Sequence, residues 1–106
     1  NRLQMILAVL QKRLALPLYK EDVYVSVSGG LSISEPAADL AVALAILSSY
    51  KEKVLGKKMI AFGELDLMGS VRKVNSEGKR VKEAKKLGFT TVTSSETLGS
   101  LSSFKI

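Results

Sequence analysis

The sequence predicts a single α+β domain in which helices pack on a mixed β-sheet. Apolar residues recur at helical spacing in three segments, and other short segments alternate polar and apolar side chains, as a half-buried strand does. These helices and strands follow one another irregularly, which favours the α+β class over a regular βαβ succession. The length of 106 residues suits one domain with its own hydrophobic core.

The N-terminal part of the chain is predicted to form a helix and then a strand. Leucine and isoleucine recur at helical spacing over residues 2–15, and Pro17 marks the end of this amphipathic helix. Valines alternate with tyrosine and serine over residues 23–27, so we expect a strand with one buried face. Gly29-Gly30 then predicts a turn.

A buried central helix is predicted from Pro36 to Tyr50. Proline suits the first turn of a helix because its missing N–H is not needed there, and Ser34 or Glu35 can accept the free amide N–H groups of that turn. The apolar, alanine-rich sequence that follows is typical of a helix that neighbouring elements cover. Residues 51–58 then form a charged connection.

Two extended segments and a turn are predicted next. Residues 59–62 are apolar and are expected to form a buried strand that ends at Gly63. Residues 64–67 alternate polar and apolar side chains, and 68–70 predict a turn into a further extended segment, 71–74.

A strongly basic helix is predicted over residues 77–87. Gly88 can end it in the left-handed conformation, with Phe89 folding back onto the last turn. A strand is expected at 90–93, and the serine-rich tail, 94–106, is expected to be weakly structured or to form a weak final helix. The apolar side of the basic helix is predicted to consist of Val81, Ala84 and Leu87.

The composition excludes several kinds of site. The chain contains neither cysteine nor histidine, so it cannot form zinc sites of the usual type, thiol nucleophiles, disulfides or a histidine-based triad. No loop has the glycine and lysine spacing that cradles a nucleotide phosphate. The longest apolar run, Leu40 to Leu47, is too short to cross a bilayer. We therefore expect a cytoplasmic protein without a membrane partner.

Several motifs resemble one known family. The central helix begins Glu35-Pro36-Ala37-Ala38-Asp39, after a strand and a glycine turn, and this arrangement is similar to the Lon-like C-terminal domain of the bacterial RadA (Sms) family of DNA repair proteins. The resemblance covers about residues 1–92. Its other motifs are Asn1-Arg2, the segment 33–44, Phe62-Gly63-Glu64, Gly69-Ser70-Val71-Arg72 and Glu83-Ala84-x-x-Leu87-Gly88-Phe89.

This resemblance implies a fold, a context and partners. The fold would be that of the Lon proteolytic domain, which is also called ribosomal protein S5 domain 2-like. The chain lacks an initial Met and is expected to be a fragment, without the family's zinc finger and RecA-like ATPase domains. ATP, Mg²⁺ and Zn²⁺ would bind those missing domains, and no cofactor is expected here. The resemblance further implies a hexameric ring that contacts duplex or branched DNA beside a branch-migration motor.

The same resemblance implies that this domain is not an enzyme. A Lon-type peptidase needs a serine at the start of the central helix and a neutral lysine that takes its proton. By the family's pattern Ala37 stands at the serine position and Gly78 near the lysine position, with Lys79 one residue further. The alternative is a serine-lysine peptidase with Ser34 as a displaced nucleophile, or a degenerate relative that binds peptides. A helix cap is the favoured role for Ser34.

Asp39, in the first turn of the same helix, also has two possible roles. Its carboxylate suits the positive end of the helix dipole or a contact with another element, which is the favoured interpretation. The alternative is a role as a general acid or base.

Most of the net charge of +6 lies in one region. Seven of the 16 basic residues but two of the ten acidic residues fall between positions 72 and 86. This region predicts either an ordinary solvated surface or a DNA interface, and the resemblance favours DNA. Aromatic residues do not alternate with the charges, so contact would be to phosphates and not to bases. The candidate residues are Arg72, Lys73, Lys79, Arg80, Lys82 and Lys86.

Overall fold

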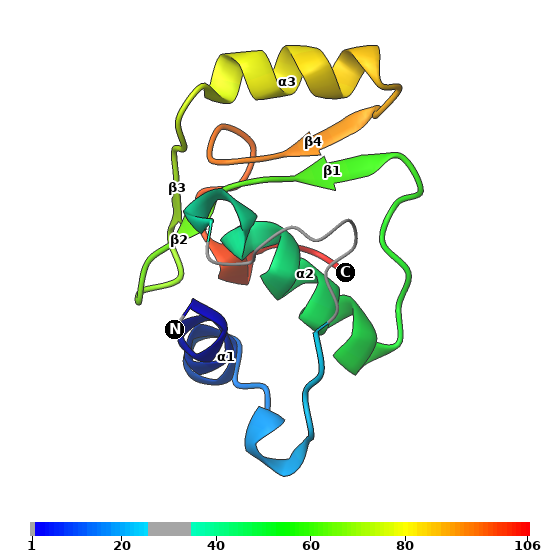
Figure 1. The fold of residues 1–106 in the computed structure, drawn as a ribbon. Coiled ribbons are helices and arrows are strands. Elements are labelled where there is room, and N and C mark those ends of the chain that lie inside the picture. The colour runs from blue at the N-terminus through cyan, green and yellow to red at the C-terminus, as the bar shows by residue number, and fades with distance from the viewer. Residues whose placement is uncertain (1, 26–34) are drawn as a thin grey trace.

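The computed structural model describes residues 2–25 and 35–106, and it has the α+β architecture that the sequence predicts (Figure 1). The longer helices are α1, α2 and α3, and the strands are β1 to β4. In chain order the elements are α1 (Arg2–Arg13), a 3₁₀ turn (Leu18–Lys20), a second 3₁₀ turn (Pro36–Ala38), α2 (Asp39–Lys51), β1 (Met59–Ala61), β2 (Glu64–Leu65), β3 (Val71–Arg72), α3 (Glu77–Lys86), β4 (Thr91–Thr93) and a last 3₁₀ turn (Leu101–Ser103).

The strands of the described residues pair in two small sheets. β1 and β4 are parallel, with Ile60 opposite Val92, whereas β2 and β3 are antiparallel, with Leu65 opposite Val71. Figure 1 shows the parallel pair between α2 and α3, and α1 on the far side of α2. Parallel and antiparallel pairings thus occur together, which confirms the α+β class, while the more specific Lon-like arrangement remains a prediction.

The hydrophobic core lies mainly between α1 and α2. Both helices place leucine, isoleucine, valine and alanine at helical spacing on the facing sides, so the two apolar stripes cover one another. The fully buried core residues of the two helices are Ile6, Val9, Leu10, Leu40, Ala43, Leu44 and Leu47.

The start of α2 is held by backbone bonds and not by the predicted cap. Glu35 occupies the cap position of the 3₁₀ turn, but its side chain makes no capping bond there, and Ser34 lies outside the described residues. Instead, the Gly63 N–H donates to the Ala37 carbonyl at 2.9 Å, and the Leu40 N–H donates to the Gly63 carbonyl at 3.0 Å. The backbone of Gly63, directly after β1, therefore bonds the polar groups at the start of the helix, a role that we expected a side chain to fill.

The C-terminus of α3 forms as predicted. Gly88 has a φ of +94°, which glycine adopts without steric cost. The Gly88 N–H donates to the Lys85 carbonyl and the Phe89 N–H to the Ala84 carbonyl, which is the hydrogen-bond pattern of a Schellman motif. One detail of the prediction is wrong, because Leu87 does not join the buried side: 67% of its surface is exposed.

The strand predicted over residues 23–27 is not formed in its described part. Residues 23–25 carry no strand, Tyr24 is 90% exposed, and Val25 is exposed as well. The remaining residues of that predicted strand, and the Gly29-Gly30 turn, lie outside the described residues. The alternation of side chains suggested a strand, but alternation cannot supply the neighbouring strand that must pair with it.

The tail, 94–106, for which a weakly structured segment or a weak final helix is expected, packs against the main core. Leu98 and Leu101 are buried in the main core, and a short 3₁₀ turn forms at Leu101–Ser103. The Val71 N–H donates to the Gly99 carbonyl at 3.0 Å, and the Leu101 N–H donates to the Gly69 carbonyl at 2.8 Å. Backbone bonds to the β2–β3 hairpin position the tail, and such bonds leave no periodic pattern of side chains in the sequence.

No helix in residues 2–25 and 35–106 combines the length and the hydropathy that crossing a bilayer requires.

Candidate functional site

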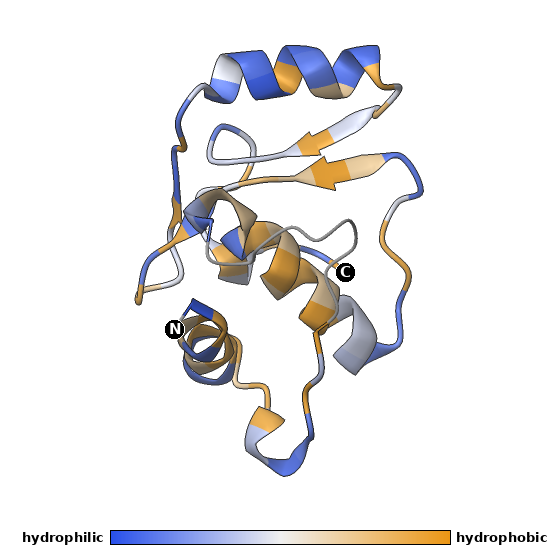
Figure 2. Cartoon of the chain, viewed as in Figure 1, coloured by the Kyte–Doolittle hydropathy of each residue, from blue (hydrophilic) through white to orange (hydrophobic). Residues whose placement is uncertain are grey.

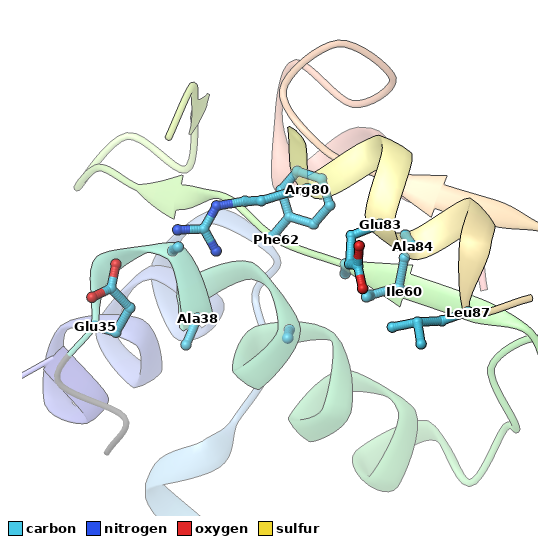
Figure 3. A pocket seen from close by; sticks show the side chains of 11 residues that line it. Glu35, Ala38, Ile60, Phe62, Arg80, Glu83, Ala84 and Leu87 are labelled. Carbon is cyan, nitrogen blue, oxygen red and sulfur yellow. The ribbon is translucent and has the colours of Figure 1, made fainter. Parts of the chain in front are cut away.

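A pocket of about 400 Å³ lies where the start of α2, strand β1 and helix α3 come together (Figure 3). Small side chains line the α2 side, and larger apolar ones line the β1 side. Figure 3 shows Arg80, Glu83 and Leu87 extending from α3 toward α2. The lining residues are Glu35, Ala37, Ala38, Ala41, Ile60, Ala61, Phe62, Arg80, Glu83, Ala84 and Leu87.

The predicted nucleophile position lies in this pocket. Ala37 is a lining residue, 4% exposed, and it carries a methyl group where a Lon-type peptidase would carry a hydroxyl. Glu35, two residues before Ala37, adds a carboxylate to the pocket lining. None of the lining residues, all of them described, has a hydroxyl, a thiol or a lysine amine.

The predicted lysine position does not reach the pocket. A Cβ atom added at Gly78 would meet no heavy atom within 4 Å, and Gly78 does not line the pocket. Lys79, one residue further, is exposed and is likewise absent from the lining. The first α3 side chain that lines the pocket is Arg80, which carries a guanidinium and not the lysine amine that a Lon-type peptidase needs.

Asp39 forms a buried ion pair that the sequence analysis did not find. Asp39 is 1% exposed. Its carboxylate accepts hydrogen bonds from Nε of Arg2 at 2.8 Å, from Nη2 of Arg2, and from the Leu65 N–H at 3.0 Å. Nη2 of Arg2 also lies 3.5 Å from Glu64. The bond to Asp39 raises the pKa of the Arg2 guanidinium above its ordinary value.

This ion pair joins three of the motifs on which the family resemblance rests. Arg2 belongs to the motif at the start of the chain, Asp39 to the one that opens the central helix, and Glu64 to the Phe62-Gly63-Glu64 motif. Of the two roles considered for Asp39, the contact with other elements is the one that the structure has. The sequence carried one signal that could have predicted this ion pair: an arginine and two carboxylates occur in three separate motifs of the same family.

A second buried carboxylate anchors the start of α3. Glu77 is 3% exposed, and the Ser95 hydroxyl donates a bifurcated hydrogen bond to its two carboxylate oxygens, at 2.9 and 3.1 Å. Its Oε1 also accepts the Val74 N–H at 3.4 Å. Glu77 thus connects α3 to the chain after β4, which explains why an acidic residue on this basic helix is buried.

The basic region has two parts with different surroundings. Lys79, Lys82 and Lys86 are exposed and lie on the side of α3 opposite the buried Ala84. Figure 2 shows this helix as largely hydrophilic, in contrast to the hydrophobic α2. These three lysines together form the lysine ridge. Within the described residues, none of the three has an ion-pair partner.

The two arginines predicted to bind DNA are engaged within the chain. Nε of Arg72 donates to Oδ2 of Asp66 at 3.1 Å, although the Arg72 side chain is 65% exposed. Nε of Arg80 donates to the Asn75 carbonyl at 2.9 Å, and Arg80 lines the pocket. Lys73 is exposed next to Arg72. The lysine ridge and Lys73 are therefore the predicted cations that remain free to meet an external anion.

Comparisons with known proteins agree with the motifs. Residues 5–97 match the family model described as subunit ChlI of Mg-chelatase. The chain is 52% identical over 89 residues to the DNA repair protein RadA of Synechocystis. These aligned residues make up 84% of this chain and 18% of that protein. It is 49% identical over 92 residues to RadA of Streptococcus pneumoniae, covering 87% of this chain and 22% of that protein.

A third relative matches over a longer stretch of the chain. RadA of Rickettsia bellii is 47% identical over 97 residues, which covers 92% of this chain and 22% of that protein. The chain spans about a fifth of the length of these curated relatives. The family model and the relatives confirm the resemblance seen in the motifs: the chain is similar to the RadA DNA repair proteins, and it belongs to the family whose model is described as subunit ChlI of Mg-chelatase.

Proposed function

We propose that this chain is a non-catalytic scaffold domain of a RadA-type DNA repair protein. In this proposal the domain supports a ring, hexameric in the whole protein, and contacts the phosphates of duplex or branched DNA. An ATP-driven branch-migration motor in the same cytoplasmic protein would act beside it. The observation that carries the proposal is the lysine ridge, since it faces away from the buried side of α3 on a chain whose relatives are named DNA repair proteins.

The lysine ridge supports phosphate contact for an electrostatic reason. Duplex DNA holds condensed cations along its phosphates, and the ridge lysines, which have no ion-pair partner within the described residues, can replace those cations. Release of the cations into solution favours binding. The ridge lies along one helix face and carries no exposed aromatic ring, so it suits a DNA backbone and gives no means of reading bases. One domain would bind weakly, and six copies in a ring would bind together far more strongly.

The experiment is a titration of labelled duplex DNA at several salt concentrations. The triple variant Lys79→Glu, Lys82→Glu, Lys86→Glu should lose affinity, and the slope of log K against log salt should fall by about 0.9 for each phosphate that is no longer neutralised. The matched control reverses three exposed lysines elsewhere, Lys12, Lys53 and Lys57, and changes the net charge equally. An affinity that ignores salt, or equal losses in both triple variants, would contradict DNA contact by the ridge.

The absence of catalysis belongs to the same proposal. Ala37 carries no oxygen for attack, and the pocket around it offers neither a hydroxyl nor a lysine amine among its described lining residues. No cofactor is proposed for this domain, and ATP, Mg²⁺ and Zn²⁺ would bind the remaining domains of the whole protein. The alternative function is a serine-lysine peptidase of the Lon class or a degenerate peptide-binding relative.

A peptide hydrolysis assay separates the two functions. We expect no cleavage of casein or fluorogenic peptides by the natural chain, and none by Ala37→Ser, because a serine without a neutral base and oxyanion donors is a poor nucleophile. Measurable hydrolysis by the natural chain that disappears when Ser34 is replaced by alanine would favour the peptidase.

A further inference from the structure

The turn between β2 and β3 presents two large apolar side chains to solvent. Leu67 is 69% exposed and Met68 is 63% exposed, and they are adjacent at the tip of the hairpin, which Figure 2 colours as hydrophobic. Single exposed apolar residues are common on protein surfaces, whereas two on one projecting turn suggest a contact surface. These two residues together form the hairpin tip.

The hairpin tip is held in one conformation before any contact. The Asp66 carboxylate accepts the Met68 N–H at 3.0 Å and the Ser70 N–H at 2.9 Å, and Gly69 has a φ of +84°. From α1, Nε of Arg13 donates to the Leu67 carbonyl at 3.4 Å. A preorganised tip loses little conformational entropy when it inserts into a partner.

The pocket between α2, β1 and α3 matches the hairpin tip in size and polarity. A water molecule occupies about 30 Å³ in the liquid, and if each heavy atom needs a similar volume, the eight side-chain heavy atoms of Leu67 and Met68 need about 240 Å³. The pocket offers about 400 Å³, and alanine, isoleucine and phenylalanine supply most of its lining. It can therefore accept both side chains.

The charges around the tip and the pocket are also complementary. Arg13 lies beside the hairpin tip, where its guanidinium contacts the Leu67 carbonyl and the Met68 sulfur, whereas Arg72 is paired with Asp66. On the pocket side, the charged lining residues are Glu35, Glu83 and Arg80, so the lining carries one net negative charge. Neither glutamate has an ion-pair partner within the described residues. Opposite charges at the edge of an apolar contact speed association and fix its orientation.

We propose that the hairpin tip of one copy of this chain inserts into the pocket of a second copy. The tip and the pocket are different surfaces, so the contact is head-to-tail, and its repetition closes into a ring when the rotation between copies allows it. This inference rests on the proposed ring assembly and names the surfaces that would form it. The small contact is weak alone, and ring closure strengthens it.

Disulfide cross-linking tests the contact directly because the natural chain has no cysteine. Met68→Cys is mixed with Ala38→Cys under mild oxidation, and mass spectrometry measures the mixed disulfide dimer. The control replaces Met68→Cys with Val54→Cys, since Val54 is 90% exposed and lies away from the hairpin. We expect the Met68 and Ala38 pair to cross-link at least about tenfold more than the control pair, the factor that burial of one large side chain provides.

A charge exchange sharpens the test. Arg13→Glu on the Met68→Cys chain should reduce the mixed disulfide, and so should Glu35→Lys with Glu83→Lys on the Ala38→Cys chain. Combining the two charge-changed chains should restore it, because each reversal then meets its opposite. Circular dichroism of each variant checks the overall fold. Because Arg13 also positions the hairpin tip through the Leu67 carbonyl, the restored yield of the exchanged pair, and not the loss in the single reversal, decides this test.

Several results would overturn the inference. One is a yield equal to that of the Val54→Cys control, and another is the absence of restoration in the charge exchange. A third is protection of Ala38→Cys from a thiol reagent in a dilute, monomeric sample, since another part of the same chain would then fill the pocket. Rings that persist in the whole protein after Leu67→Ser and Met68→Ser would also refute this contact.

These results are distinguishable from failure of the proposed function. Cross-linking needs no DNA, so a failed cross-link with a normal, ridge-dependent DNA titration leaves the scaffold proposal standing. A successful cross-link with no ridge-dependent DNA binding would instead support ring assembly and contradict the DNA contact.

Discussion

The start of α2 and the outer face of α3 differ in what their polar side chains do. At the start of α2, Asp39 is buried, and Arg2 and the Leu65 N–H occupy its carboxylate. On the outer face of α3, the lysine ridge is exposed and has no ion-pair partner within the described chain. The first region uses its charges to hold elements together, and the second keeps its charges available for a partner.

This difference teaches which motif residues to substitute for which purpose. Motifs that meet around Asp39 are expected to report on stability, because their replacement leaves a buried charge or a gap. Replacements on the lysine ridge are expected to change binding and to leave stability almost unaltered. Substitutions in the core, at the buried ion pair and in the hairpin can break or sharpen this division.

The largest effect is expected from the tail, which belongs structurally to the core. Leu101→Ala should lower the free energy of unfolding by about 3 kcal/mol, because Leu101 is 0% exposed and its removal leaves a cavity. The matched control is Leu87→Ala on α3, whose side chain is 67% exposed and which should cost less than about 0.5 kcal/mol. Urea unfolding followed by circular dichroism measures both. Equal effects would mean that the tail does not pack as described.

A somewhat smaller effect is expected at the buried ion pair. Asp39→Ala should lower the free energy of unfolding by about 2–3 kcal/mol, because it leaves Arg2 and the Leu65 N–H without their partner. The Arg2 side chain is 29% exposed, so water recovers part of the loss. Lys79→Ala is the control and should change stability by less than about 0.5 kcal/mol. A comparable loss in the control would remove the contrast between the two regions.

The close packing after β1 gives a third prediction. A Cβ atom on Gly63 would lie 2.7 Å from Cγ1 of Val71, so Gly63→Ala should cost about 1–3 kcal/mol through overpacking. Adding Val71→Ala removes the clashing methyl groups, and the double variant should recover part of the loss relative to the sum of the single variants. Gly78→Ala is the control, because its added methyl group meets nothing within 4 Å. Strictly additive losses would contradict the clash.

The smallest effect concerns acid stability of the hairpin. Hydrogen bonds from the Ser70 N–H, the Arg72 guanidinium and the Met68 N–H hold the pKa of Asp66 below its ordinary value of 3.8. A carboxyl whose pKa is lower in the folded chain stabilises the fold above its unfolded pKa, and this contribution is lost as pH falls through the folded pKa. As the pH falls below about 5, into the range where carboxyls titrate, Asp66→Asn should therefore lose less stability than the natural chain does.

Thermal unfolding over a pH series measures this difference. The natural chain and Asp66→Asn should differ by a constant amount near neutral pH, and the two curves should converge only as Asp66 takes up its proton. Parallel curves through the acid range would mean that the hydrogen bonds to Asp66 do not stabilise the charged form.

Elements with local signals could be predicted from the sequence. The helical spacing over α1 and α3, the glycine that ends α3, and the turn before β3 all act within a few residues, so their patterns are visible in the chain. Failures involve distant partners. The exposed Leu87 looked like a core residue by its spacing, but it lines the pocket and keeps 67% of its surface exposed.

The candidate site was predicted only in part. Ala37 and Gly78 could be placed at catalytic positions by resemblance, and the structure puts Ala37 in the pocket but Gly78 away from it. The role of Arg80 could not be predicted, because its position on the helix is equally compatible with an outward cation and with a pocket residue. In the structure Arg80 lines the pocket, and its Nε donates to the Asn75 carbonyl.

The sequence by itself excluded sites that need cysteine or histidine. It also determined the three main helices, the concentration of positive charge on one helix, and the methyl group at the start of α2. Only the tertiary structure decided that Asp39 pairs with Arg2, that the tail enters the core, and that a pocket opens between α2, β1 and α3. The physical reason is distance along the chain. Periodicity and caps act within a few residues, whereas ion pairs, cavities and burial depend on segments that folding alone brings together.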